Sequence, residues 1–138
     1  MDIQLQTIYV GSVKRVVALV IDGRNPVLEF FEEHESSPTQ LAQLRARYET
    51  VADIPNFRNT DAFKPLGEGL FEFRTRQGLR LYAFHDEGHL IIATNGGGKG
   101  GRKEQDRDIR RARQLKNDYF NAKQQTERNP NIKIRTIP

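Results

Sequence analysis

The stretch LFEFRTRQGLRLYAFHDEGHLIIAT, residues 70–94, decides the fold. It contains three runs rich in aromatic and apolar residues. Two short segments, each ending in glycine, separate these runs. Such a pattern predicts three consecutive antiparallel strands, at 70–75, 79–85 and 89–94, joined by tight turns.

The first turn decides which side chains share a face of this sheet. A three-residue turn over 76–78, with its glycine in the left-handed conformation, keeps the apolar side chains on one face. The opposite face then carries Glu72 across from Tyr82 and Arg74 across from Arg80. A two-residue turn would mix the arginines with apolar neighbours, so the three-residue turn is favoured.

The second turn sets the register of the third strand. Three residues, 86–88, again separate the two runs, which predicts Thr94 beside Arg80 and Ile92 beside Tyr82. We therefore expect the three strands to form one continuous antiparallel sheet.

Helices and further strands surround this sheet. The runs 7–10 and 13–21 predict a hairpin whose second strand is buried on both faces, and two helices begin at Asn25-Pro26 and at Ser36-Ser37-Pro38. The remaining segments predict an ordered loop (53–69), a glycine loop (95–101), an amphipathic helix (102–123) and a polar tail that alternates like an edge strand (124–138). The order predicts an α+β fold: a small, mainly antiparallel sheet with two N-terminal helices and a C-terminal helix packed on one face.

Length and composition bound the class of protein. The 138 residues, 36% of them hydrophobic, suit one domain with a single small core. No apolar run approaches the roughly 20 residues of a membrane-spanning helix, so we expect a cytoplasmic protein without a membrane span. The absence of cysteine excludes disulfides, thiolate metal sites and thiol nucleophiles. His85 and His89 have no third ligand at a fixed spacing, so neither a metal site nor a cofactor is predicted.

The formal net charge of +4 is unevenly distributed along the chain. Residues 1–70 carry seven basic and ten acidic side chains, whereas residues 71–138 carry fifteen and eight. A basic half on a small protein is typical of a polyanion-binding surface, and nucleic acid is the commonest polyanion in the cytoplasm. The alternative is a solvated face whose charges pair locally.

The polar face of the predicted sheet has the residue types for phosphate chemistry. Two opposed arginines repel each other unless an anion or an acidic neighbour relieves them. Guanidinium groups bind phosphate bidentately, so Arg74 and Arg80 could stabilise the charge that develops when an RNA 2′-hydroxyl attacks its own phosphodiester. Glu72 would then act as the base. The alternative is a structural ion pair between Glu72 and one of the arginines.

The segment NGGGKGG, residues 95–101, joins a strand to a helix, as phosphate-binding loops do. It does not match a Walker A motif, because Ala93 stands six positions before Lys99 and Gly100 replaces the Ser or Thr that holds magnesium. The sequence favours a basic loop that follows a polyanion backbone, with a plain linker as the alternative.

Three segments resemble the RelE/HigB/ParE toxin superfamily, and most closely its phage-derived, HigB-like branch. They are VVALVIDGRNPVLEFFEEH (16–34), FKPLGEGLFEFRTRQGLRLYAF (63–84) and KGGRKEQDRDIRRARQLKNDY (99–119). The most specific part is a lysine and a leucine before an aromatic-Glu-x-Arg strand and a second, arginine-bearing strand: Lys64, Leu66, Phe71, Glu72, Arg74 and Arg80.

This resemblance implies a RelE-like toxin domain over residues 1–123, with helices on one sheet face and the active site on the other, and a tail over 124–138. It implies the toxin of a type II toxin-antitoxin system, a ribosome-dependent and metal-independent endonuclease that cleaves mRNA. The implied partners are mRNA, the ribosome and a cognate antitoxin, expected to be a helix-turn-helix protein encoded next to the toxin.

The resemblance also assigns roles to individual residues. Arg74 and Arg80 match phosphate-contacting arginines, and Glu72 stands where some members place an acidic catalytic residue. RNA binding is expected of Lys64, Tyr82, Lys99, Arg102, Lys103 and Arg107. No histidine or tyrosine matches the family's acid after the last strand, so the proton donor to the leaving oxygen is unassigned. The alternative function is that of a non-catalytic member of the same fold, a gyrase-directed inhibitor or a phage-derived partner-binding protein.

Overall fold

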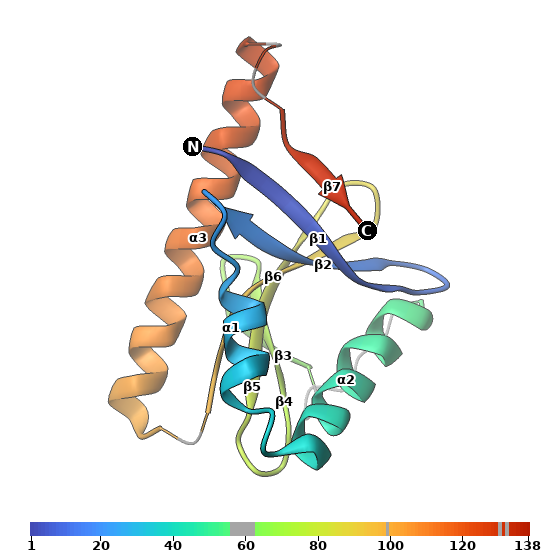
Figure 1. Cartoon of the computed structure of the whole chain (residues 1–138), viewed down its shortest axis with the longest axis vertical. Coiled ribbons are helices and arrows are strands. Elements are labelled where there is room, and N and C mark those ends of the chain that lie inside the picture. Colours follow the sequence, from blue (N-terminus) through green and yellow to red (C-terminus); the bar gives the residue numbers. More distant parts are fainter. Residues whose placement is uncertain (56–62, 99, 130, 132) are drawn as a thin grey trace.

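The three runs of residues 70–94 form the strands β4 (Leu70–Arg74), β5 (Arg80–Asp86) and β6 (Leu90–Gly97). The computed structural model describes residues 1–55, 63–98, 100–129, 131 and 133–138. Within these residues the fold is α+β, with one seven-stranded, mostly antiparallel mixed sheet, two N-terminal helices and a long C-terminal helix (Figure 1).

The other strands extend this centre on both sides. They are β1 (Ile3–Val10), β2 (Arg15–Ile21), β3 (Phe63–Gly67) and β7 (Arg135–Ile137), and the order across the sheet is β3-β4-β5-β6-β2-β1-β7. The pairs β2–β6 and β1–β7 are parallel, and the remaining pairs are antiparallel. The hairpin expected from the first 21 residues is confirmed, since β1 and β2 pair directly.

One strand lies where the sequence predicts a loop. Residues 63–67 form β3, which pairs with β4 through Phe63 opposite Phe73. The Phe63 ring also packs on Phe71, with ring centroids 4.2 Å apart, so aromatic burial holds this proline-containing segment at the sheet edge. Residues 56–62 of the expected loop lie outside the described residues.

Two helices cover one face of the sheet. They are α1 (Pro26–Glu33) and α2 (Pro38–Asp53), and the side chain of Asn25 accepts a hydrogen bond from the Leu28 amide at 3.0 Å, as expected of an N-cap. Phe30 of α1 and Leu44 of α2 are buried in one cluster with Val16, Phe73 and alternate residues of the central strands. This cluster is the larger part of the hydrophobic core.

The third helix, α3 (Arg102–Arg128), packs on the opposite face. Its Tyr119 and Ala122 are buried with Val17, Leu19 and Phe84, the alternate residues of strands that also line the first cluster. Figure 1 shows α3 and α2 on opposite sides of β5. The expectation that every helix packs on one face is therefore wrong, because strands that are apolar on both faces need a cover on each side.

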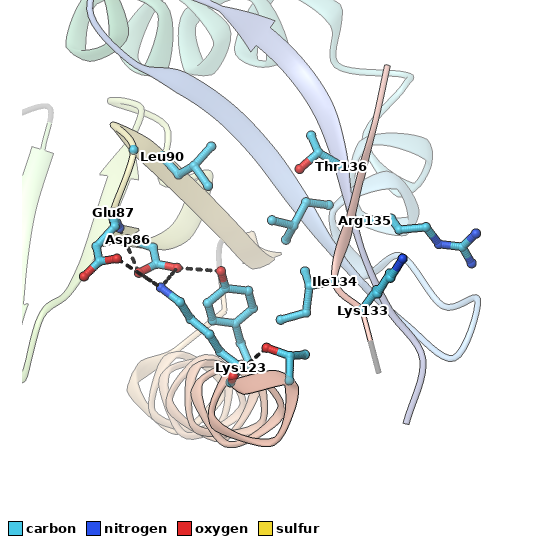
Figure 2. Close-up of a pocket in the computed structure, with 12 residues that line it drawn as sticks. Asp86, Glu87, Leu90, Lys123, Lys133, Ile134, Arg135 and Thr136 are labelled. Carbon is cyan, nitrogen blue, oxygen red and sulfur yellow. Dashed lines mark hydrogen bonds and ion pairs between the residues drawn. The ribbon is translucent and has the colours of Figure 1, made fainter. Parts of the chain in front are cut away.

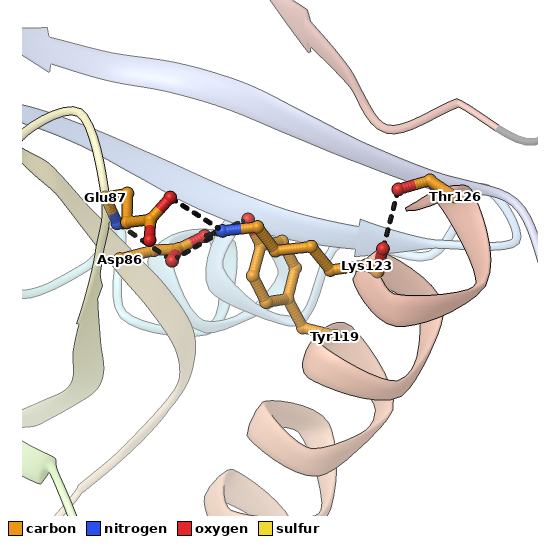
Figure 3. Close-up of polar contacts among 5 residues, drawn as sticks. All are labelled: Asp86, Glu87, Tyr119, Lys123 and Thr126. Atoms are coloured by element: carbon orange, nitrogen blue, oxygen red, sulfur yellow. Dashed lines mark hydrogen bonds and ion pairs between the residues drawn. The ribbon is translucent and has the colours of Figure 1, made fainter. Parts of the chain in front are cut away.

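A polar network fixes the second half of α3 to the turn between β5 and β6. Asp86 accepts hydrogen bonds from the Tyr119 hydroxyl at 2.5 Å and from Lys123 Nζ at 2.9 and 3.0 Å. The network lines an open groove of about 720 Å³ between α3, this turn and the C-terminal segment (Figure 2). Glu87 Oε2 lies 3.8 Å from the same lysine nitrogen, and Figure 3 shows this second carboxylate beside Lys123.

The network keeps Asp86 ionised. Burial acts to raise the pKa of this carboxyl, but the hydrogen bonds from Tyr119 and Lys123 outweigh burial, so the pKa lies below its usual value. The bonds are charge-assisted because the carboxylate is ionised, and they are poorly screened because only 6% of the Asp86 side chain is exposed.

We predict that Asp86→Asn lowers the free energy of unfolding by about 1–3 kcal/mol at neutral pH, because charge-assisted bonds to a buried carboxylate are lost. The loss should shrink as the pH falls below about 4, because the unfolded parent chain then binds a proton at Asp86, whereas the folded carboxyl, with its lowered pKa, is protonated only at still lower pH. Urea denaturation across pH tests both points. Glu87→Gln is the matched control: its carboxylate is 92% exposed, so a change within about 0.5 kcal/mol is expected. Equal losses in the two variants would contradict the assignment.

Candidate functional site

The first hairpin turn has the geometry that the sequence predicts. Arg74 pairs with Arg80 and Glu72 pairs with Tyr82. Gly78 has a φ of 97°, which is the left-handed conformation that a side chain rarely adopts. The predicted register of β4 and β5 is therefore confirmed, and the polar set shares one face.

An ion pair joins the two strands on this face. Arg80 Nε lies 3.5 Å from Glu72 Oε2, and the two side chains are 17% and 5% exposed. The Arg80 guanidinium also donates to the Gly78 carbonyl at 3.1 Å, which orients it across the end of the hairpin. The carboxylate thus relieves the repulsion between Arg80 and Arg74, as the ion-pair interpretation of the sequence requires. The Arg80 side chain nevertheless remains partly accessible to solvent.

The register of the third strand differs from the prediction. Arg80 pairs with Gly97 rather than Thr94, and Tyr82 pairs with Asn95 rather than Ile92. Two features cause the difference. The turn spans residues 87–89, with His89 in the left-handed conformation, and Thr94 is an extra residue in a β-bulge. The first three residues of the expected glycine loop consequently belong to β6.

Helix α3 covers much of the face that the sequence predicts to be open. Ile109 and Ala112 of α3 pack against Leu70 and Tyr82. Tyr82 is completely buried, and its hydroxyl has no hydrogen-bond partner among the described residues. Burial, followed by the charge of Glu72, raises the pKa of this tyrosine above its usual value. Tyr82 therefore lies in the interior, without an exposed ring on which an RNA base could stack.

Sequence reasoning missed Asp108, whose carboxyl lies over Gly97, the register partner of Arg80. The backbone carbonyl of Asp108 accepts a hydrogen bond from Asn95 Nδ2 at 3.1 Å, and the Thr94 hydroxyl fixes Asn95 Oδ1 at 2.8 Å. A Cβ at Gly97 would collide with the Asp108 carboxylate. Because glycine has no side chain, the carboxylate has room to lie over the β6 residue that pairs with Arg80. One signal was available: Asp108 stands four residues before the buried Ala112, on the same side of the helix.

The basic residues expected to bind RNA lie around this end of the sheet. Lys64 is exposed on the edge strand β3, in register with Glu72. Arg102, Lys103 and Arg107 are exposed on the first two turns of α3. Lys99 lies outside the described residues. The exposed basic side chains thus flank the row of Arg74, Arg80 and Gly97 from the β3 side and from the α3 side.

Two negative findings concern the described residues alone. Among residues 1–55, 63–98, 100–129, 131 and 133–138, no group of three or more His, Cys, Asp or Glu side chains is placed to hold a metal ion. No helix in the same part of the chain has both the length and the apolar character needed to cross a membrane.

The structure is that of a small α+β protein whose β4–β5 hairpin carries two opposed arginines. A family model described as "Phage derived protein Gp49-like (DUF891)" matches residues 33–117. The chain belongs to this phage-derived Gp49-like family, which is part of the RelE/HigB-like toxin group. A search of curated proteins found no match. The matched range includes Glu72, Arg74, Arg80 and Asp108.

The buried hydroxyl of Tyr82 leads to a stability prediction. Tyr82→Phe should leave the free energy of unfolding unchanged or raise it by up to about 1–3 kcal/mol, because it removes a buried polar group without a partner. Tyr119→Phe is the matched comparison. The Tyr119 hydroxyl donates a hydrogen bond to Asp86, so its removal should lower the free energy of unfolding. Urea denaturation measures both. A loss above about 1 kcal/mol for Tyr82→Phe would show that the hydroxyl has a partner after all.

Proposed function

We propose that this chain is the toxin of a type II toxin-antitoxin system and that it cleaves mRNA on the ribosome. The observation that carries the proposal is the Glu72–Arg80 pair at the end of the β4–β5 hairpin, with Arg74 directly opposite Arg80. Membership of the phage-derived Gp49-like family supports the toxin assignment. The endonuclease activity itself rests on the chemistry that these three side chains can perform.

The proposed reaction uses the RNA as its own nucleophile. Glu72 accepts the proton of a 2′-hydroxyl, and the 2′-oxygen attacks the adjacent phosphorus. Arg74 and Arg80 stabilise the additional negative charge on the phosphoryl oxygens through charge-assisted hydrogen bonds. The bond to the 5′-oxygen then breaks, which leaves a 2′,3′-cyclic phosphate and a 5′-hydroxyl. No step requires a metal ion or a cofactor.

The surrounding basic side chains suit an RNA backbone. Lys64 on one side and Arg102, Lys103 and Arg107 on the other are exposed, and each can contact a phosphate. We assign Lys99 to the same surface on its sequence position alone. Tyr82 is buried, so in our proposal it supports the sheet beneath the site instead of contacting RNA.

The proposal also includes partners and a compartment. A ribosome-dependent nuclease acts in the cytoplasm, on mRNA that is being translated. A cognate antitoxin, encoded next to the toxin and carrying a helix-turn-helix domain, would bind this chain and restrain it. Co-expression of such a neighbour should relieve growth arrest.

We predict that Arg80→Lys lowers the rate of mRNA cleavage by about 10²–10³-fold, because lysine keeps the charge but loses the planar fork that stabilises the phosphoryl oxygens. The measurement is cleavage of an mRNA on purified, programmed ribosomes. Arg76→Lys is the matched control. Arg76 is exposed in the hairpin turn, so this variant should cleave mRNA at the parent rate. Equal cleavage by the Arg80→Lys variant and the parent would contradict the site assignment.

A second variant tests the base. Glu72→Gln keeps the shape of the side chain and an acceptor for Arg80, so the fold should persist, whereas general-base loss should slow cleavage by about 10²–10⁴-fold. Full activity of a folded Glu72→Gln chain would remove Glu72 from the chemistry.

One observation favours the non-catalytic alternative. Glu72 is only 5% exposed and already paired with Arg80, which is what a purely structural ion pair looks like. A gyrase-directed inhibitor or a partner-binding protein would inhibit DNA supercoiling or bind its partner while translated mRNA stays intact. Mapping of mRNA ends with and without translation, alongside a supercoiling assay, separates the two functions.

A further inference from the structure

The proposed cleavage consumes a proton at the leaving 5′-oxygen, and the residues assigned so far do not supply it. Glu72 gains a proton in the attack step, and the two arginines keep theirs. Tyr82 is fully buried beneath α3, so its hydroxyl does not reach the surface of the site. Among the residues that the structure describes, Asp108 is a further titratable group at this row, because its carboxyl lies over Gly97, the register partner of Arg80.

The position of Asp108 follows from the glycine below it. Gly97 is the register partner of Arg80 on β6, and a Cβ there would collide with Asp108 Oδ2. The carboxyl therefore lies directly over the Gly97 backbone, where a side chain would otherwise stand. On the neighbouring strand, the register partner of this glycine is Arg80, one of the two arginines that would hold the phosphate.

The second turn of α3 is held in place by the bulge in β6. Asn95 Nδ2 donates to the Asp108 carbonyl at 3.1 Å, and the amide of Asn95 is oriented by the Thr94 hydroxyl. Thr94 is the bulge residue, and it also donates to the Tyr82 carbonyl at 3.3 Å. The carboxyl is thus carried on a rigid support, as a preorganised proton donor requires.

Burial favours the protonated form of Asp108. Burial raises the pKa of this carboxyl, and the charges of Arg107 and Arg111 on α3 partly oppose that effect. Glu104 acts to raise the pKa further, and Arg80 on β5 acts to lower it, so the balance is a raised pKa. A carboxyl with a raised pKa is protonated more often at neutral pH than an exposed aspartate.

We propose that Asp108 is the general acid, donating its proton to the leaving 5′-oxygen; this inference rests on the proposed function. The bond between the 2′-oxygen and phosphorus forms while the bond between phosphorus and the 5′-oxygen breaks. The electron pair of the broken bond passes to the 5′-oxygen, which takes the Asp108 proton. Glu72 holds the proton of the 2′-hydroxyl, and exchange with solvent restores both carboxyl groups.

A sulfur substitution at the leaving atom tests this role directly. Ribosomes are programmed with an mRNA whose scissile 5′-oxygen is replaced by a bridging sulfur, and with the normal mRNA. Thiols have a pKa of about 8.5, so a thiolate leaves without a proton donor. Asp108→Asn should cleave the normal linkage about 10²–10⁴-fold more slowly than the parent and cleave the sulfur linkage at nearly the parent rate.

Two controls bracket the result. Asp106→Asn, at an exposed position of the same helix, should cleave both linkages as the parent does. Glu72→Gln should be slow on both, because sulfur does not replace the base. Gly97→Ala displaces the Asp108 carboxyl without removing it, and it should reproduce the pattern of Asp108→Asn if that variant fails to fold.

Each remaining outcome overturns the proposal. Full activity of Asp108→Asn on the normal linkage would show that another group is the acid, and slow cleavage of both linkages would assign Asp108 a positioning role. Rescue by sulfur in Tyr82→Phe but not in Asp108→Asn would transfer the role to Tyr82. If the parent chain cleaves neither mRNA, the proposed function fails first and the inference falls with it.

Discussion

The central strands of this protein are apolar on both faces, and the rest of the structure depends on that constraint. In β2, Val16 and Ala18 face α1 and α2, whereas Val17 and Leu19 face α3. The same alternation continues through β6 and β5. A single layer of helices leaves half of these side chains in water, at a cost of about 25 cal/mol for each Å² of apolar surface. The long helix α3 is therefore part of the core.

The position of α3 then determines where chemistry can occur. The helix covers Tyr82 and Leu70. Near its second turn, where Asn95 donates to the Asp108 carbonyl, the helix stops covering the sheet. Beyond that contact lies the row of Arg74, Arg80 and Gly97. The proposed site thus forms at the border between buried sheet and solvent. A carboxyl group in such a place is partly desolvated and still reachable, which is what acid and base catalysis requires.

The predictable parts of the site are those set by local sequence. The register of Arg74 with Arg80 follows from one turn, and Gly78 alone determines its type. The register of β6 was predicted wrongly, because a left-handed residue that is not glycine and a one-residue bulge leave no clear pattern in the sequence. The apolar stripe of α3 correctly indicated a buried face, but a stripe does not say which face of the sheet it covers. The strand expected over residues 13–21 was predicted to be buried on both faces. That prediction already required side chains from other elements to pack on each face of the sheet. Asp108 was missed because it is the bulged register that places Gly97, over which the Asp108 carboxyl lies, opposite Arg80.

The central claim is that the scissile phosphate binds at the partly accessible side chain of Arg80, and a structure tests it most directly. The parent chain would be bound to a ribosome programmed with an mRNA that carries a 2′-O-methyl group at the nucleophile, so that cleavage is blocked without changing the protein. We predict hydrogen bonds from the Arg74 and Arg80 guanidinium groups to the phosphate 3′ of that nucleotide, with the Asp108 carboxyl facing the 5′-oxygen. An mRNA path over the helices α1 and α2, or along the groove beside Asp86, would contradict the account.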